Sequence, residues 1–540
     1  MFDITGDDIA KLNDADLRTL VARLALAELA ARDAPLSAVT AGGNQDAADG
    51  GLDVRVESGV PLTAPDFVPR AQTGFQVKKP DMPGSSITKE MRPEGTLRDV
   101  IGALADAGGA YIIVSAQGSV ADKPLQDRKK VMRDALAGHP KANALLTDFY
   151  DRNRLANWVN HYPGVAAWVR GKIGGDISGW LPIGDWSGTS TVGGGDYLFD
   201  GKTCLIDERS RQREKLSLIE GIERIRASLR EPRQCIRLIG LSGLGKTRLV
   251  QALFETGIGG APLDPSLSVY TDYSDEITPT AREMARRLVQ AGQRAILIVD
   301  NCNPTTHTEL AIICSSDRSK VTLITIEYDV RDDEPERTEV FRLESASSDL
   351  VEEWLKRDFE HVSQNDRRRI AEFSDGNFRV ARALAETVRR GETLGQLRSR
   401  ELFERIFHQR NQPDQQLLRD AETLSLLYSF DGVDDSVESE LTRLAGFADR
   451  TIPILYASIA ELHRRGVVQS RGRWRAILPH AIANPLAARA LERIPVSAFD
   501  GFCASLPARM LKSLSRRIGY LHDSDHAQAA VARWLLPNGP

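Results

Sequence analysis

The sequence predicts an α/β protein in which two sheet-containing domains precede a largely helical C-terminal part. The first observation is an apolar strand, a glycine-rich loop and an amphipathic helix in direct succession over residues 235–256. The second is the continuous apolar run 295–299, which ends at Asp300 and is typical of a strand buried on both faces. The third is the alternation of apolar and polar residues over 52–57 and 74–79, which predicts two half-buried strands.

The composition indicates a soluble protein of several domains in a reducing compartment. A length of 540 residues is enough for about three or four domains. The acidic N-terminal stretch lacks the order of a signal peptide, and no apolar run approaches the roughly 18 residues that span a bilayer. The five cysteines are scattered and form no C-x-x-C pair, so we expect neither a disulfide framework nor a cysteine zinc site. We therefore predict a cytoplasmic protein, and the net charge of −5 restricts any nucleic-acid binding to a local groove.

The first predicted element is a helix over residues 14–32. Leu17, Val21 and Leu24 recur at helical spacing and form one apolar stripe. Glu28 follows four residues after Leu24, at the edge of that stripe. A carboxylate on an edge that faces the core needs a partner or a metal, although an exposed glutamate in an alanine-rich helix is the simpler interpretation of Glu28 by itself.

The two half-buried strands bring polar side chains together. Because side chains alternate between faces, Asp53 lies opposite its apolar neighbours, and Gln76 and Lys78 share one face of the following strand. Neighbouring strands can therefore present Asp53, Gln76 and Lys78 to one site, with Glu28 approaching from the helix. Asp49 is a rival metal ligand, but beside two glycines it is more typical of a turn.

This order of helix Glu28, strand Asp53 and strand Gln76-Val-Lys78 resembles the PD-(D/E)xK nuclease superfamily, in its Q-x-K variant close to Mrr-type restriction endonucleases. The resemblance implies a restriction-endonuclease-like α/β domain, to which we assign residues 1–190. It also implies that Asp53 and Glu28 hold Mg²⁺, that Gln76 assists, and that Lys78 orients or activates the attacking water. Gln76 stands where many members carry a carboxylate, so Glu28 is expected to carry more of the metal binding.

The end of this domain is rich in aromatic and basic residues. Four of the seven tryptophans fall within residues 148–186. They could stack on nucleic-acid bases, but we favour a small aromatic core that closes the domain. The basic stretch 127–133 could meet phosphates, although such a run is more often a solvated face. The glycine-rich run 187–195 is a predicted linker.

The segment 240–247, GLSGLGKT, fits the P-loop pattern G-x-x-x-x-G-K-[ST] and assigns a P-loop NTPase core to residues 200–344. Its glycines let backbone N–H groups turn inward around a phosphate, and the following helix adds its positive end. Lys246 would reach the β- and γ-phosphates of ATP, and the Thr247 hydroxyl would ligate Mg²⁺. The residues expected to contact the nucleotide here are Gly240, Ser242, Gly243, Gly245, Lys246, Thr247 and Arg248.

The apolar strand that ends at Asp300 fits a Walker B element. Asp300 would hold Mg²⁺ at the carboxyl end of its strand, beside the P-loop. Many P-loop ATPases carry an acid at the next position, but this chain has Asn301, and an amide cannot accept a proton from water. We therefore expect slow hydrolysis, with the nucleotide acting as a switch. On the next predicted strand, either Thr325 or Glu327 could contact the γ-phosphate or supply the missing acid.

Residues 345–395 are predicted to form a helical lid. The segment 376–379, Gly-Asn-Phe-Arg, resembles the G-[DN]-x-R sensor 2 element of AAA+ lids. The resemblance implies that Arg379 closes onto the γ-phosphate through charge-assisted hydrogen bonds. An exposed helix arginine is the alternative interpretation.

Residues 396–495 contain three predicted helices and then a hairpin, which is a winged-helix pattern. This domain could bind DNA through arginines such as Arg464, or it could pack back on the nucleotide. His480 follows the hairpin where STAND-type ATPases carry a histidine that contacts the ADP β-phosphate, although alone it is more typical of a core histidine. The helices predicted over 496–540 suit the first unit or two of a helical repeat array that is truncated or supplied elsewhere.

The whole order of domains resembles bacterial antiviral STAND ATPases of the Avs type, which are AAA+-like and carry an Mrr-like nuclease as effector. The resemblance implies ATP and Mg²⁺ as cofactors, homo-oligomerisation on ATP binding, a phage protein bound by a C-terminal sensor, and cleavage of double-stranded DNA. Two other functions stay open. One is a STAND-type transcription regulator that binds DNA through the winged helix. The other is an ATP-dependent restriction or repair motor, against which Asn301 argues.

Overall fold

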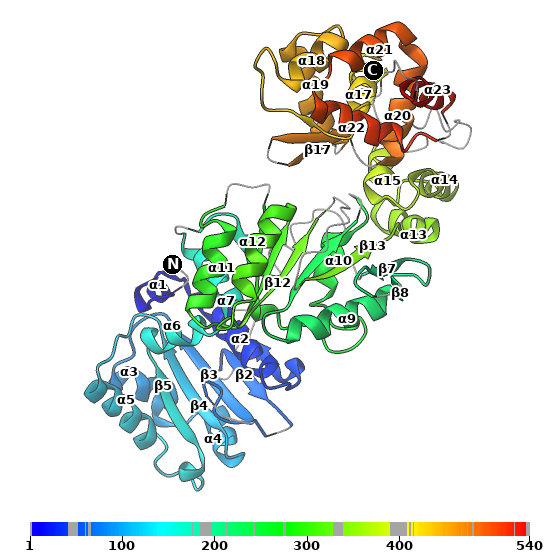
Figure 1. Cartoon of the computed structure of the whole chain (residues 1–540). Helices are drawn as coiled ribbons and strands as arrows, with labels where there is room; N and C mark the ends of the chain where they lie inside the picture. The colour runs from blue at the N-terminus through cyan, green and yellow to red at the C-terminus, as the bar shows by residue number, and fades with distance from the viewer. Residues whose placement is uncertain are drawn as a thin grey trace.

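The computed structural model arranges the chain as a row of domains (Figure 1). The N-terminal domain lies at one end, the P-loop domain in the middle, and the helical C-terminal part at the other end. The described residues are 3–41, 52–59, 61–62, 66–174, 177–183, 197–210, 213–240, 243–273, 277–327, 338–388, 408–409, 412–413, 415–465, 467–471, 473–477, 480–522 and 524–535.

The N-terminal domain is built on a five-stranded mixed sheet of order β1-β2-β3-β4-β5. The first three strands are antiparallel neighbours, and β3, β4 and β5 run parallel. The strands are β1 (Val39–Ala41), β2 (Val54–Glu57), β3 (Gln72–Lys78), β4 (Ala110–Ser115) and β5 (Leu146–Tyr150). This sheet contains the two alternating strands expected from the sequence, and register pairs Val54 with Phe75 across them.

Helices cover both faces of this sheet (Figure 1). The predicted stripe of α2 is buried beneath one face, where it joins a core that includes Phe75 and Ile112. The helices of this face are α2 (Asp14–Ala30), α6 (Arg152–Asn160) and α7 (Pro163–Ile173). The opposite face has a separate core that includes Tyr111 and Ile113. Its helices are α3 (Gly84–Met91), α4 (Asp99–Asp106) and α5 (Asp122–Asp134). The polar site residues of β3 therefore lie on the face opposite α2.

The P-loop domain is built on an eight-stranded sheet of order β6-β10-β11-β12-β9-β13-β7-β8. The five strands from β10 to β13 in this order are parallel. The flanking strands β6 and β7 are antiparallel to their neighbours in this group, and β8 pairs antiparallel with β7. The parallel strands are β9 (Cys235–Ile239), β10 (Ser268–Asp272), β11 (Ala295–Asp300), β12 (Val321–Ile326) and β13 (Glu339–Leu343). The other strands are β6 (Trp180–Leu181) and β8 (Glu214–Ser217) at the two edges, and β7 (Cys204–Asp207) between β13 and β8. The helices are α9 (Leu218–Arg230), α10 (Lys246–Ala252), α11 (Ala281–Gln290) and α12 (Pro304–Cys314).

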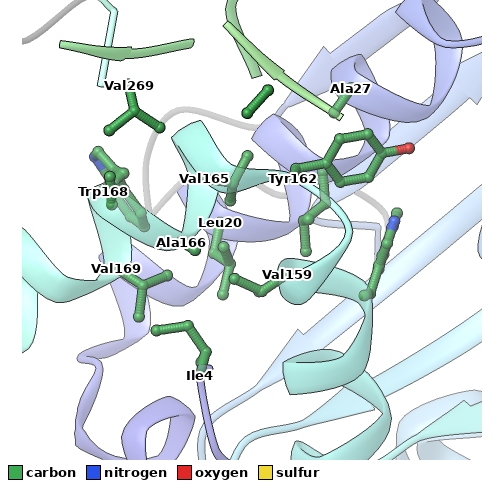
Figure 2. Close-up of a cluster of buried hydrophobic side chains, with 14 of the residues drawn as sticks. Ile4, Leu20, Ala27, Val159, Tyr162, Val165, Ala166, Trp168, Val169 and Val269 are labelled. Atoms are coloured by element: carbon green, nitrogen blue, oxygen red, sulfur yellow. The ribbon is translucent and has the colours of Figure 1, made fainter. Parts of the chain in front are cut away.

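One hydrophobic core joins the two sheets. It runs from α2 through α6 and α7 to Val269 of β10 (Figure 2). Trp168 of α7 is buried in it, and Trp158 of α6 stacks on Phe67 with ring centroids 5.1 Å apart. Strand β6 belongs to the P-loop sheet, where the Trp180 indole donates to Pro279 O at 2.8 Å. The second sheet therefore begins before the expected boundary at residue 190, and these tryptophans pack in cores.

The C-terminal part shares a third core. The lid helices are α13 (Ser348–Asp358), α14 (Gln364–Ser374) and α15 (Phe378–Ala385). The winged-helix pattern is present as α17 (Gln415–Ser425), α18 (Glu440–Phe447), α19 (Ile452–Arg464) and the small sheet β16 (Phe430–Asp431), β18 (Trp474–Ile477) and β17 (Val468–Arg471). Four helices follow, α20 (His480–Arg493), α21 (Val496–Ser505), α22 (Ala508–Ile518) and α23 (Asp525–Trp534). Within the described part of the chain, no helix is both long and apolar enough to span a membrane.

Candidate functional sites

The P-loop has the backbone that a phosphate cradle needs. Gly240, Gly243 and Gly245 have φ values of +145°, +85° and +92°, which favour glycine. A Cβ at Gly243 would lie 2.4 Å from Asn377 Oδ1, so this position also needs a residue without a side chain. A Cβ at Gly245 would instead face the pocket, with its nearest neighbour at 3.9 Å. Ser242 lies outside the described residues.

Lysine, threonine and aspartate side chains converge beside this cradle. Lys246 Nζ donates to Gly240 O at 2.8 Å, and Thr247 Oγ1 donates to Asp300 Oδ2 at 2.7 Å. Burial raises the pKa of the Asp300 carboxyl above its usual range, with a contribution from the charge of Asp272, although the Thr247 hydrogen bond lowers it. A buried carboxylate beside a hydroxyl is a set of hard oxygen donors. These residues therefore fit Mg²⁺ and the phosphates of a nucleotide.

Asn301 lines this pocket and also contacts a second carboxylate, that of Asp272. Its backbone is left-handed, with φ +51°, and its Nδ2 donates to both carboxylate oxygens of Asp272 at 2.9 and 3.0 Å. Asp272 ends β10 and is the register partner of Asp300 on β11. A second carboxylate therefore stands at the carboxyl edge of the sheet, one strand away from the Walker B aspartate.

The structure separates the two candidates on β12. Thr325 is fully buried, and its hydroxyl lies 2.7 Å from His307 Nδ1. It is therefore tied to the core and not available to a nucleotide, contrary to the expectation from sequence. Glu327 lines the pocket instead, and it forms a buried ion pair with Arg237 at 2.6 Å.

The lid docks directly on the P-loop. Phe378 N donates to Gly243 O at 2.9 Å, and Asn377 caps α15. Arg379 follows on the first turn and lines the pocket. Removal from bulk water lowers the pKa of Arg379, while the charges of Asp300 and Asp272 raise it, so both carboxylates lie within its electrostatic reach.

Together these elements enclose a cavity of about 380 Å³. One part is polar and consists of the P-loop, Asp300 and Arg379. The other part is lined mainly by apolar and aromatic residues, which include Tyr197, Leu198, Leu218, Leu343, Trp354 and Phe378. The cavity therefore suits a molecule with a charged end and a planar, apolar end.

Residues outside the core also reach this region. Arg248 lines the cavity, pairs with Glu255, and lies over the Tyr197 ring at 5.1 Å. Gln469 of the winged-helix domain lines the cavity too. His480 begins α20, but its side chain lies outside what the structure describes. On the far side of the winged helix, Arg464 pairs with Glu461.

The N-terminal sheet brings Asp53 and the Q-x-K strand together. Asp53 N donates to Phe75 O at 2.9 Å, and Asp53 Oδ2 accepts a hydrogen bond from Val77 N at 2.7 Å. Val77 lies between Gln76 and Lys78, so Asp53 is anchored to the backbone of the Q-x-K segment. A cation already approaches this carboxylate, because Arg18 Nε of α2 lies 3.0 Å from Asp53 Oδ1.

Two buried oxygen atoms at this site lack a hydrogen-bond partner among the described residues. They are Gln76 Oε1 and the hydroxyl oxygen of Tyr111 on β4. Burial raises the pKa of the Tyr111 phenol, and the charges of Glu90 and Asp53 raise it further, so both carboxylates lie near it. Buried polar atoms are normally paired, so unpaired ones indicate a missing water, ion or ligand. Gln76 Oε1 and Asp53 together fit a hard divalent cation.

Lys78 lies at the same edge of the sheet and is held by a charged neighbour. Its Nζ is 3.1 Å from Glu90 Oε2 on α3. Glu90 in turn pairs with Arg98 at 3.2 Å. The lysine is therefore oriented by α3 and stays partly exposed.

Glu28 does not join this group. Its carboxylate accepts from the Trp158 indole at 3.0 Å and pairs with Arg32 at 2.6 Å. Arg18 and Glu28 are ten residues apart on α2, which places them roughly 15 Å apart along the helix axis. Glu28 therefore stabilises the packing of α2 on α6, and the structure does not place it as a ligand of the metal expected at Asp53.

Comparisons with known proteins add only a general likeness. No protein-family model and no curated protein matches the chain. Solved structures that align with parts of the chain include the STAND protein with a tetratricopeptide repeat sensor from Pyrococcus horikoshii, at 11% identity and a TM-score of 0.26 over 58% of this chain and 54% of that one. The Walker-type ATPase of Pyrococcus abyssi aligns at 13% identity and a TM-score of 0.26, over 49% of this chain and 94% of that one. The chain thus spans about half the length of the STAND protein. At these TM-scores the assignment of a P-loop NTPase core rests on the sheet order and the site itself.

Four side chains at the two sites escaped the sequence analysis. Asp272 ends a predicted strand, but only the strand order shows that this strand adjoins Asp300. Arg18, Glu90 and Tyr111 reach the other site from elements whose side chains carry no motif. The spacing between Glu90 and Lys78, twelve residues with a turn between them, offers no periodic signal.

Proposed function

We propose that this chain is a nucleotide-gated, Mg²⁺-dependent endonuclease that cuts double-stranded DNA. Two observations carry the proposal. Asp53 is anchored to the Q-x-K strand by a hydrogen bond from Val77 N, and Gln76 Oε1 on that strand is buried and unpaired among the described residues. An acid, an uncharged oxygen donor and a lysine at one sheet edge suit phosphodiester hydrolysis better than a purely structural role, because the arrangement leaves a buried polar atom unsatisfied.

The residues of this site would have different roles in catalysis. Asp53 and Gln76 would hold the metal, which supplies positive charge and lowers the pKa of bound water. Lys78 would orient that water or stabilise the charge that develops on the phosphate. Glu90 positions Lys78 through their ion pair. Glu28 has no part in this assignment.

The P-loop pocket would bind ATP and gate the nuclease. Lys246 would exchange its Gly240 carbonyl for the phosphates, while Thr247 and Asp300 would hold Mg²⁺. Arg379 stands on a lid that already contacts the P-loop, so a bound γ-phosphate would reinforce that contact. The continuous core between the two sheets gives the pocket a physical route to the nuclease.

The biological setting belongs to the same proposal. The chain would act in the cytoplasm in antiphage defence. ATP binding would favour a homo-oligomer in which nuclease domains cluster, and a phage protein would be the trigger through a C-terminal sensor.

The test is a plasmid-cleavage assay with and without ATP and Mg²⁺. We expect cutting by the wild-type chain only when both are present, and no cutting by Lys78→Ala, which should still bind ATP. The matched control is Lys79→Ala, which removes the adjacent lysine and should cut normally. Lys246→Ala should fail to respond to ATP. Cleavage that persists in Lys78→Ala contradicts the proposed nuclease site.

A further inference from the structure

We propose that Asp272 is the proton acceptor for nucleotide hydrolysis and that Asn301 holds its carboxylate in place. The inference rests on the proposed binding of ATP at the P-loop. The sequence has Asn301 where many P-loop ATPases carry an acid. In this proposal the acid comes instead from the neighbouring strand.

The strand order puts Asp272 in position. β10 adjoins β11 directly, and the register pairs Asp272 with Asp300 at the ends of the two strands. The hydrogen bonding between the two strands extends one residue further, since Tyr273 N donates to Asp300 O at 2.9 Å. Ligands of parallel α/β sheets bind at the carboxyl ends of the strands. Asp272 therefore lies at the edge where the phosphates are expected.

Asn301 fixes the direction of the Asp272 carboxylate. Its Nδ2 contacts both oxygens, at 2.9 and 3.0 Å, from a left-handed backbone at φ +51°. Left-handed backbone is tolerated best by glycine, asparagine and aspartate. An asparagine here can thus take the backbone position next to the Walker B acid and still donate a hydrogen bond. A glutamate at the same position could not donate to Asp272.

The charges around Asp272 distinguish it from the other acid near the pocket. Glu327 is fully buried and paired with Arg237 at 2.6 Å, so its charge is already balanced. Asp272 is only half-buried, and it lies within electrostatic reach of Asp300 and of the lid residue Arg379. A carboxylate that water can reach is better placed to take a proton from water than one that is fully buried in an ion pair.

The proposed step is hydrolysis of ATP at its γ-phosphorus. The oxygen of a water forms a bond to the γ-phosphorus, and one proton of that water passes to the Asp272 carboxylate. The bond from the γ-phosphorus to the oxygen that bridges it to the β-phosphate breaks, and that oxygen leaves with ADP. The products are ADP, inorganic phosphate and one proton, which Asp272 returns to solvent. Arg379 is placed to balance charge on the phosphate as this happens.

The test uses the full chain and two readouts. Asp272→Asn keeps the shape of the side chain but cannot accept the proton, so we expect turnover of ATP to fall about 100-fold or more. The affinity for a fluorescent ATP analogue should stay within about twofold of wild type, because general-base catalysis adds little to ground-state binding. Asp317→Asn, which changes an exposed aspartate, is the matched control.

Each outcome has a definite consequence. Turnover at the wild-type level in Asp272→Asn overturns the inference, and so does a loss that appears only in Glu327→Gln. If Asp272→Asn does not fold, as judged by its thermal transition, Asp272→Glu replaces it and should keep part of the activity. Wild-type protein that does not bind the ATP analogue overturns the nucleotide assignment itself, and this inference with it.

Discussion

The two candidate sites handle charge in opposite ways. In the P-loop pocket, Lys246 donates to the Gly240 carbonyl and Asp300 accepts from the Thr247 hydroxyl, so these two charged groups have uncharged hydrogen-bond partners. At the proposed nuclease site, Asp53 contacts Arg18 and Lys78 contacts Glu90, so both groups form ion pairs. Lys246 and Asp300 are therefore prepared for a charged ligand, whereas the proposed nuclease site must exchange ion pairs before it can bind one.

The largest expected effect comes from breaking the prepared site. Lys246→Ala removes the cation that would meet the β- and γ-phosphates, so binding of ATP should be lost. With ligand at 100 times its dissociation constant, ATP should stabilise the wild-type chain by about 2.7 kcal/mol and the variant by almost nothing. Thermal unfolding with and without ATP and Mg²⁺ measures this. An equal stabilisation of both proteins contradicts the assignment of Lys246.

A smaller effect separates structure from chemistry at Glu28. Glu28→Gln leaves Arg32 buried without its anionic partner, and breaking such a pair should lower the free energy of unfolding by about 3 kcal/mol. Cleavage per folded molecule should stay unchanged, because Glu28 does not contact the nuclease site. Denaturant unfolding and the plasmid assay together check this prediction. A stable variant that cannot cut would restore Glu28 as a metal ligand.

The smallest effect concerns the ion pair at Asp53. Arg18 competes with a cation for the same carboxylate, so Arg18→Ala should lower the Mg²⁺ concentration for half-maximal cleavage by about threefold, the equivalent of a partly exposed ion pair. A Mg²⁺ titration of plasmid cleavage gives the value. The neighbouring Arg23→Ala, on the same helix, serves as the control. A higher Mg²⁺ requirement in Arg18→Ala would mean that Arg18 assists the site instead of opposing the metal.

Contiguous motifs were predictable from the sequence, and contacts between distant elements were not. The P-loop glycines, the strand to Asp300 and the winged-helix pattern follow from local spacing, because one strand, loop or helix carries the whole signal. The apolar run around Thr325 predicts a buried strand. It does not show that the Thr325 hydroxyl contacts His307 instead of the nucleotide, because that contact depends on how α12 packs on the strand.

The positions of the Glu28 and Asp272 carboxylates could not be predicted for the same reason, since each depends on contacts between distant elements. Glu28 lies at the edge of an apolar stripe whether it is an exposed residue or a metal ligand. Only the packing of α6 shows that the Trp158 indole donates to it. Asp272 becomes part of a site through the order of strands in a sheet, which no window of sequence contains. The prediction for Asp53, Gln76 and Lys78 needed only that their two strands be neighbours, and β2 and β3 do pair in the sheet.

Helix α7 gives the shared core a mechanical property. It packs against β10, which ends at Asp272, and against α2, which carries Arg18. At Gly164 its backbone meets the neighbouring chain so closely that a Cβ would lie 2.8 Å from Ser266 O. This close backbone contact leaves little room for α7 and the start of β10 to shift independently. We therefore expect a displacement at the phosphate edge of the sheet to reach α2, and Arg18 with it, through α7.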